Sequence, residues 1–182
     1  MSRIAYVNGH YVPHRKAAVH IEDRGYQFAD GVYEVCEVLG GHLVDEKRHM
    51  QRLARSLSEL RIRQPMQDSA LGVILREVVA RNRVRDGLIY LQVTRGVAPR
   101  NHFFPPDDTP PGVVVTARSS SVAKASALAE QGVKILSLPD NRWNRVDIKS
   151  VALLPNVLAK QAAREQGAYE AWFVDSNGYV IQ

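Results

Sequence analysis

Two short stretches near the start of the chain have the apolar, β-branched and aromatic pattern that is typical of strands. In the first, residues 4–7 and 11–12 are apolar runs on either side of Asn8-Gly9, a dipeptide that favours a tight hairpin turn. Residues 31–44 repeat this arrangement around a Gly-Gly pair. The chain is therefore predicted to begin with two β-hairpins.

Helical periodicity replaces this pattern over residues 46–60 and again over residues 67–81. Apolar side chains recur there every three or four residues, which places them on one stripe of an amphipathic helix. The stripes consist of Met50, Leu53, Ala54, Leu57 and Leu60 in the first segment, and of Leu71, Ile74, Leu75, Val78 and Val79 in the second.

Two further strands are predicted at residues 88–94 and 112–117, on either side of a proline-rich loop over residues 98–111. Loops longer than about 12 residues are usually functional or disordered. This loop contains Arg100 and His102, and we expect it to serve the function of the protein.

A small and polar stretch over residues 119–126 separates two apolar parts of the chain, as a linker does. We therefore expect an N-terminal α+β domain over residues 1–118, the linker over 119–126, and a second domain over 127–182. The second part is predicted to contain a strand at 133–138, a loop at 140–147, a helix at 156–166 closed by Gly167, and a strand at 169–174.

The last residues have the pattern of a returning strand that stops at Gln182. A strand that stops there would leave a sheet edge and a core unfinished. From this pattern we expect the second domain to be truncated.

Composition and charge argue against several classes of partner and site. The net charge is +5, but the basic residues are scattered and are not interleaved with aromatics, which argues against a nucleic-acid partner. No apolar run approaches roughly 18 residues and no signal peptide is evident, so we expect a cytoplasmic protein without a membrane partner. The single cysteine, Cys36, is interpreted as a small core residue, and the histidines lack the spacing of metal ligands, so no metal site is expected.

Lys149 is the leading candidate for chemistry. It lies between a stretch that contains Arg142 and Arg145 and an apolar helical run. Lysine forms Schiff bases with carbonyl groups, but its amine is nucleophilic only when it is deprotonated. Partial desolvation and neighbouring positive charges favour the deprotonated amine, whereas a lysine without such a setting is usually a solvated surface residue.

Four segments of the chain, one of which contains Lys149, resemble the motifs of one known protein family. They read DRGYQFADGVYEV (23–35), EKRHMQRL (46–53), YLQVTRGVAPRNH (90–102) and RWNRVDIKSVALLPNVLAK (142–160). In order and approximate spacing they resemble the fold-type IV pyridoxal-phosphate aminotransferases, and among these the D-amino acid aminotransferases. The resemblance implies a two-domain fold with a small N-terminal α+β domain and a β-rich, cofactor-binding C-terminal domain, of which this chain would contain only the start.

The resemblance also implies roles for individual residues. Lys149 would attach pyridoxal 5′-phosphate covalently and then act as a general base. Arg52 would contact the phosphate, for which a guanidinium fork is well suited. Tyr33 and Val35 alternate on one strand and would face the substrate. His49, one turn before Arg52, is interpreted either as a supporting residue or as a structural histidine.

Arg100 and His102 are two residues apart and can converge on one carboxylate. In the D-amino acid aminotransferases such a pair binds the substrate α-carboxylate from the neighbouring subunit, so the resemblance implies a homodimer. It also implies transamination between a D-amino acid such as D-alanine and a 2-oxo acid such as 2-oxoglutarate, giving pyruvate and D-glutamate.

Other interpretations stay open. Branched-chain L-amino acid transaminases, (R)-amine transaminases and aminodeoxychorismate lyases share the fold, although the Arg-x-His pair favours the D-specific enzymes. The acidic residue that the family pairs with the pyridine nitrogen would fall just beyond Gln182. A hypothesis from another class is therefore a non-catalytic fragment that dimerises.

Overall fold

The computed structural model describes residues 3–181, which divide into two compact units. The first comprises the chain up to Ser121 together with Asp147–Val151, and the second comprises Val122–Val146 and the residues from Ala152 onward. The short piece around Lys149 thus packs with the first unit, although it lies far along the chain.

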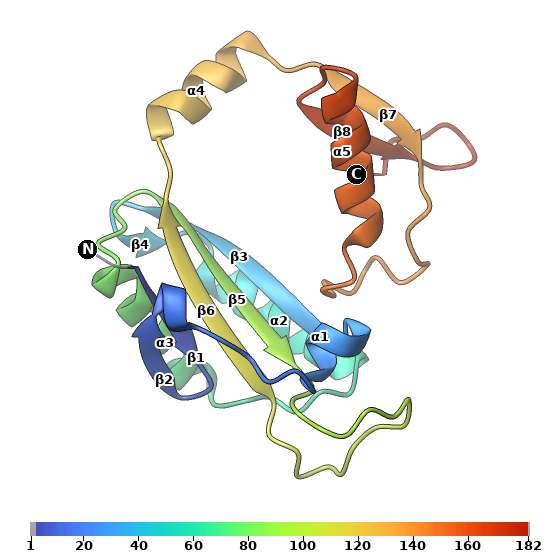
Figure 1. The fold of residues 1–182 in the computed structure, drawn as a ribbon. Helices are drawn as coiled ribbons and strands as arrows, with labels where there is room; N and C mark the ends of the chain where they lie inside the picture. The colour runs from blue at the N-terminus through green and yellow to red at the C-terminus, as the bar shows by residue number, and fades with distance from the viewer. Residues whose placement is uncertain (1–2, 182) are drawn as a thin grey trace. The chain divides into compact units, whose positions relative to one another are not determined.

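A six-stranded antiparallel sheet forms the first unit, and two helices cover one of its faces (Figure 1). The strand order is β2-β1-β6-β5-β3-β4. In chain order the elements are β1 (Ile4–Val7), β2 (His10–Pro13), the 3-10 turn η1 (His14–Lys16), α1 (Arg24–Phe28), β3 (Gly31–Leu39), β4 (His42–Leu43), α2 (Glu46–Glu59), α3 (Asp68–Arg81), β5 (Gly87–Thr94) and β6 (Gly112–Ser119).

Both predicted hairpins are confirmed. Asn8 and Gly9 have φ of 45° and 96°, and the Gly-Gly pair between β3 and β4 also has positive φ at both residues. Positive φ at both central residues is what a two-residue hairpin turn needs to match the twist of its strands. The sequence did not predict α1, a single helical turn between the two hairpins.

The predicted helices and their apolar stripes are confirmed as well. Met50, Leu53 and Leu57 of α2 are buried, as are Leu71, Leu75, Val78 and Val79 of α3. They pack with the side chains that alternate inward from β3, Val32, Cys36 and Val38. Burial raises the pKa of the Cys36 thiol to about 12, and the nearby Glu34 carboxylate adds to this shift. Cys36 is therefore a core residue, as its position in a strand suggested.

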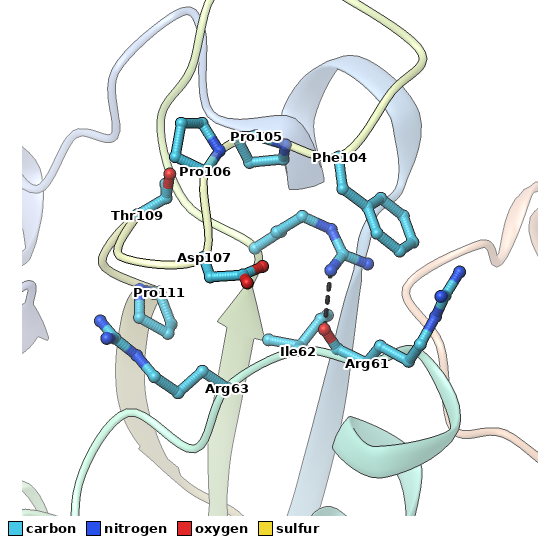
Figure 2. Close-up of a pocket in the computed structure, with 10 residues that line it drawn as sticks. Arg61, Ile62, Arg63, Phe104, Pro105, Pro106, Asp107, Thr109 and Pro111 are labelled. Carbon is cyan, nitrogen blue, oxygen red and sulfur yellow. Dashed lines mark hydrogen bonds between the residues drawn. The ribbon is translucent and has the colours of Figure 1, made fainter.

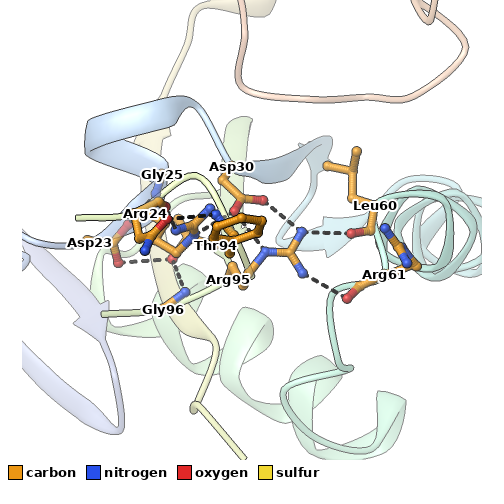
Figure 3. Close-up of polar contacts among 11 residues, drawn as sticks. Asp23, Arg24, Gly25, Asp30, Leu60, Arg61, Thr94, Arg95 and Gly96 are labelled. Atoms are coloured by element: carbon orange, nitrogen blue, oxygen red, sulfur yellow. Dashed lines mark hydrogen bonds and ion pairs between the residues drawn. The ribbon is translucent and has the colours of Figure 1, made fainter. Parts of the chain in front are cut away.

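A buried ion cluster joins α1, the start of β3, the end of β5 and the end of α2 (Figure 3). Asp30 accepts hydrogen bonds from Nε of Arg24 at 2.8 Å and from Nε and Nη2 of Arg95 at 2.7 and 2.9 Å. Arg95 also donates to the carbonyl oxygens of Leu60 and Arg61, at 2.7 and 2.9 Å. These carbonyls lie at the C-terminus of α2, where a cation is favourable for the helix dipole.

Gly25 shows how tightly α1 approaches β5. Asp23 caps α1 by accepting from the Gly25 N–H, and its other oxygen accepts from the Thr94 hydroxyl at 2.9 Å. A Cβ atom on Gly25 would lie 2.3 Å from Cγ2 of Thr94. Only glycine fits between the capping carboxylate and the end of β5.

The second unit contains a two-stranded parallel sheet and two helices. Its elements are α4 (Val122–Gln131), β7 (Ile135–Pro139), α5 (Leu154–Glu165) and β8 (Glu170–Val174). The strands and the helix that ends before Gly167 agree with the prediction, and Gly167 has φ of 68°. Residues 122–126, which fall in the expected linker, lie within α4. Beyond β8 the described chain returns through a bridge between Val174 and Val180.

Leu75 tests the core of the first unit. It is 1% exposed, so Leu75→Ala removes buried methyl groups and leaves a cavity, and we expect the free energy of unfolding to fall by about 2–5 kcal/mol. Urea unfolding followed by circular dichroism measures this change. Val73→Ala on the same helix is the control, because Val73 is 62% exposed. Equal effects of the two variants would contradict the assignment of the buried stripe.

Asp30 predicts a pH dependence. Burial alone would raise the pKa of Asp30, but the hydrogen bonds from Arg95 and Arg24 outweigh it and lower the pKa below its ordinary value. A carboxyl with a lowered folded pKa stabilises the protein above the unfolded pKa, and this contribution is lost as the pH falls through the folded value. Asp30→Asn should therefore cost most stability near pH 7, and its difference from wild type should shrink below about pH 4. Urea titrations at several pH values measure it, with Asp108→Asn in an exposed loop as the control, and a difference independent of pH would refute the prediction.

Candidate active site

The backbone around Lys149 is added to the edge of the main sheet. The Tyr33 N–H donates to the Lys149 carbonyl at 3.0 Å, and the Val151 N–H donates to the Gly31 carbonyl at 3.0 Å. An antiparallel bridge joins Val32 and Ser150 between these two bonds. The edge is available because β4 pairs only with the far end of β3. Lys149 is therefore held by strand-type hydrogen bonds.

Helix α2 supports the same segment. The Ser56 hydroxyl is buried and accepts a hydrogen bond from the Lys149 N–H at 3.3 Å. Arg55, one residue earlier, donates to the carbonyl and to the carboxylate of Asp147, both at 2.8 Å. The lysine segment is thus fixed between β3 and the last turns of α2.

The side chain of Lys149 lies against Tyr33. Its Nζ is 3.3 Å from Oη of Tyr33 and 4.3 Å from the centroid of the ring. Ile148 and Ser150 on either side are buried, and Lys149 itself is half-buried. Within residues 3–181 no carboxylate pairs with this amine, whereas Lys160 of α5 forms an ion pair with Glu170.

Tyr33 and Val35 lie on the face of the sheet opposite α2 and α3, as the strand alternation predicted. The register places Gln92 beside Tyr33 and Tyr90 beside Val35. The rings of Tyr33 and Tyr90 stack with centroids 5.7 Å apart, and the Tyr90 hydroxyl donates to Oε1 of Gln92 at 2.7 Å. Burial, with a smaller contribution from Tyr33, raises the pKa of Tyr90 to about 12, so its phenol remains a neutral donor at neutral pH.

Arg52 is bound to Glu34, a residue of the inward face of β3. Its Nε and Nη2 donate to the two carboxylate oxygens at 2.7 Å each, and Nδ1 of His49 lies 2.8 Å from one of them. Glu34 is 1% exposed, so its charge is neutralised by these partners. The hydrogen bonds that Arg52 donates to Glu34 raise the pKa of Arg52 above its ordinary value. Nη1 of Arg52 forms no hydrogen bond within the described part of the chain.

Arg100 and His102 are brought together at a different place, around the ring of Phe28. The Arg100 guanidinium lies 5.0 Å from the ring centroid, and the His102 ring meets it edge-on at 5.5 Å. Both side chains are exposed. Among residues 3–181, no hydrogen bond, ion pair or ring contact joins either of them to Lys149 or Tyr33.

Arg142 and Arg145, expected beside Lys149, belong to the second unit. Arg142 donates to Asp140 from Nε at 2.8 Å and from Nη2 at 3.0 Å, and it lies over the ring of Phe173. The expected proximity of these arginines to the lysine stays a prediction.

No group of three or more metal-binding side chains gathers within residues 3–181. No helix of this part of the chain is long and apolar enough to cross a membrane.

Comparison with known proteins decides the family. Residues 31–182 match the family described as amino-transferase class IV. The chain belongs to the class IV aminotransferases. The fold predicted from the resemblance, that of the fold-type IV aminotransferases, is thereby confirmed.

Curated relatives of this class IV chain include two D-alanine aminotransferases. That of Listeria monocytogenes serotype 4b is 44% identical over 166 residues, which are 91% of this chain and 57% of the relative. That of Bacillus licheniformis is 44% identical over 164 residues, 90% of this chain and 57% of the relative. The chain thus spans little more than half the length of these relatives.

Solved structures show the same fold at lower identity. The branched-chain amino acid aminotransferase of Escherichia coli superposes with a TM-score of 0.80 at 22% identity, covering 99% of this chain and 60% of that one. The branched-chain aminotransferase of the archaeon Thermoproteus uzoniensis gives a TM-score of 0.84 at 20% identity, covering 100% of this chain and 63% of that one.

Four residues of the site were missed from the sequence: Glu34, Ser56, Tyr90 and Gln92. A signal existed for Glu34, because it is an acid at an inward position of a strand and must find a partner there. A signal also existed for Ser56, a hydroxyl next to the apolar stripe of α2. Tyr90 and Gln92 depend on the register between β3 and β5, which the sequence alone did not specify.

Glu34 provides a test of this arrangement. Glu34→Gln removes the charge from a buried acceptor of Arg52 and His49, and we expect a loss of about 1.5–3 kcal/mol in the free energy of unfolding. Urea unfolding measures it. Glu37→Gln is the matched control, since Glu37 lies on the same strand and is exposed. If both variants unfold at the wild-type urea concentration, the pairing contributes nothing to stability.

Proposed function

We propose that this chain forms part of a pyridoxal-phosphate-dependent aminotransferase that acts on D-amino acids. The observation that carries the proposal is the amine of Lys149, which is half-buried beside Tyr33 and has no carboxylate partner within residues 3–181. Its backbone is fixed to β3 and to α2. An amine held in this way is available to bind a carbonyl group covalently.

The donor set of the first unit fits pyridoxal phosphate. Lys149 offers the amine for the aldehyde, and the Tyr33 phenol lies within 3.3 Å of it. Arg52 offers Nη1 for the phosphate, while Glu34 binds the other two donors and fixes the plane of the guanidinium. When bound, the cofactor supplies an electron sink for the negative charge at the substrate Cα.

The side chains of this chain would then act on the substrate proton. Lys149 would hold the cofactor covalently, and its amine, when free, would act as the general base that removes the proton from the substrate Cα. Tyr33 accepts a hydrogen bond from Nζ and so orients the amine. Val35 and the stacked Tyr90 line the same face of the sheet and limit the size of the substrate side chain.

Arg100 and His102 support the D-specific interpretation. Side by side on Phe28, one brings a positive charge and the other a ring N–H, which together suit a carboxylate. Among residues 3–181 no contact joins them to Lys149 or Tyr33, which is compatible with a contribution to a neighbouring subunit in a homodimer. With the D-alanine aminotransferases as relatives, we assign the reaction as D-alanine plus 2-oxoglutarate giving pyruvate plus D-glutamate.

Two alternatives have their own support. The solved branched-chain aminotransferases share the fold, and a branched-chain L-amino acid would then be the substrate. The chain also spans only 57% of its relatives, so by itself it could be a non-catalytic part. The first alternative is tested by comparing the turnover of D-alanine and L-leucine by the full-length protein. The second is tested by asking whether the protein attaches the cofactor.

Lys149 makes the proposal testable. The full-length protein is incubated with pyridoxal phosphate, reduced with borohydride and digested for peptide mass analysis. We expect a pyridoxyl group on the peptide that contains Lys149, because reduction makes the covalent attachment permanent.

Lys149→Ala should abolish this adduct. Lys160→Ala is the control and should retain it, because the Lys160 amine is paired with Glu170. An adduct on another lysine, or none on the wild-type protein, would overturn the assignment of Lys149 and leave the non-catalytic alternative.

A further inference from the structure

The loop that contains Arg100 and His102 has no regular structure of its own. The residues between Ala98 and Pro111 form neither a helix nor a strand. Two side chains that converge on one carboxylate need a fixed geometry, since a displacement of about 1 Å can cost binding or rate heavily. Because no ladder of backbone hydrogen bonds orients this loop, other contacts must do so.

Arg24 supplies the first of these contacts. Its Nη1 donates to the carbonyl oxygen of Asn101 at 2.6 Å, between the two candidate substrate-binding residues. Its Nε is held by Asp30, and its side chain is 5% exposed. The guanidinium therefore connects the buried ion cluster directly to the loop backbone.

Phe28 supplies the second contact. Three cationic or ring groups surround its ring: the guanidinium of Arg24 at 4.8 Å, that of Arg100 at 5.0 Å and the edge-on ring of His102 at 5.5 Å. Cations and polarised ring edges are attracted to an aromatic face. One ring thus serves as a common platform for both loop side chains.

The loop is fixed again just beyond His102. The ring of Phe104 lies between Arg95 at 3.7 Å and Arg61 at 4.7 Å. Arg95 cannot move freely, because it is bound to Asp30 and to the end of α2 (Figure 3). Beneath Phe104 and the prolines that follow, a pocket of about 420 Å³ is open (Figure 2). The loop does not rest on a packed core there, so its position depends on these side-chain contacts.

The ion cluster also needs the loop. It contains two buried guanidinium groups, those of Arg24 and Arg95, which share the carboxylate of Asp30. A buried charge is tolerated only when further acceptors surround it. The Asn101 carbonyl and the Phe104 ring provide two of them. Cluster and loop therefore stabilise each other in one arrangement.

We propose that Arg24 and Phe28 are positioning residues that hold Arg100 and His102 in the geometry that binds a substrate carboxylate. The proposal rests on the function proposed above for Arg100 and His102. Neither positioning residue touches the substrate, and both act through the loop.

The test uses the full-length enzyme with D-alanine and compares Arg24→Lys, Phe28→Leu and Arg100→Ala. Lysine retains a positive charge near Asp30 but has no fork to reach Asn101 at the same time. Leucine fills much of the ring volume but offers no aromatic face. We expect Arg24→Lys and Phe28→Leu each to raise the KM for D-alanine by about tenfold. Their kcat should change by less than about twofold, as for a loss of substrate binding.

A second measurement does not depend on turnover. Amide hydrogen exchange of residues 100–104 should accelerate in both variants, because the loop loses a fixing contact. Arg81→Ala is the control for both measurements, since Arg81 is exposed on α3 and pairs with Glu77. It should leave both KM and loop exchange at wild-type values.

The outcomes separate this proposal from the one on which it rests. If Arg100→Ala leaves KM unchanged, the carboxylate role fails and the positioning role fails with it. If Arg100→Ala raises KM but Arg24→Lys and Phe28→Leu do not, only the positioning role is overturned. A fall in kcat at constant KM would also overturn it, and Phe28→Leu keeps the test valid if Arg24→Lys does not fold.

Discussion

The neutralisation of two buried arginines by one aspartate is the constraint on which the first unit depends. Asp30 binds both Arg24 and Arg95, and backbone carbonyls and aromatic rings complete the surroundings of the two guanidinium groups. Removing charges from water is expensive unless every partner is in place. The end of α2, the end of β5, the turn before β3 and the loop after β5 are therefore tied to one point, and a shift of any of them would leave a buried charge with an incomplete shell.

The position of Lys149 depends on an edge of β3 to which a segment far along the chain is hydrogen-bonded. Because β4 covers only the far end of β3, the near end can pair with residues 147–151. Ser56 and Arg55 of α2 complete the support. The backbone that carries Lys149 is thus held by the sheet and by α2, which suits the role proposed for its amine, since a group that transfers protons must stay aligned.

The two faces of β3 differ in their ionic contacts. On the inward face, Glu34 binds Arg52 and His49, so one carboxylate both completes the core and orients a guanidinium. On the outward face, Tyr33 lies against Lys149 and stacks on Tyr90, and within the described residues no acid binds the amine. Lys160, by contrast, is paired with Glu170. The alternation of a single strand thus places the residue proposed to support the cofactor and the residue proposed to react on opposite faces of the sheet.

The sequence by itself determined the elements whose cause is local. The hairpin turns at Asn8 and at the glycine pair, the apolar stripes of α2 and α3, and the glycine that closes α5 follow from positive φ and from period, which each segment carries alone. It also indicated the family, through four motifs spread over residues 23–160. Only the tertiary structure decided which strands pair and in what register, that Glu34 binds Arg52, and that residues 147–151 pair with β3. These depend on register and on contacts between residues far apart in the sequence, such as Lys149 and Tyr33, which are 116 positions apart. The buried charges of Asp30, Arg24 and Arg95 likewise come together only when the sheet has formed.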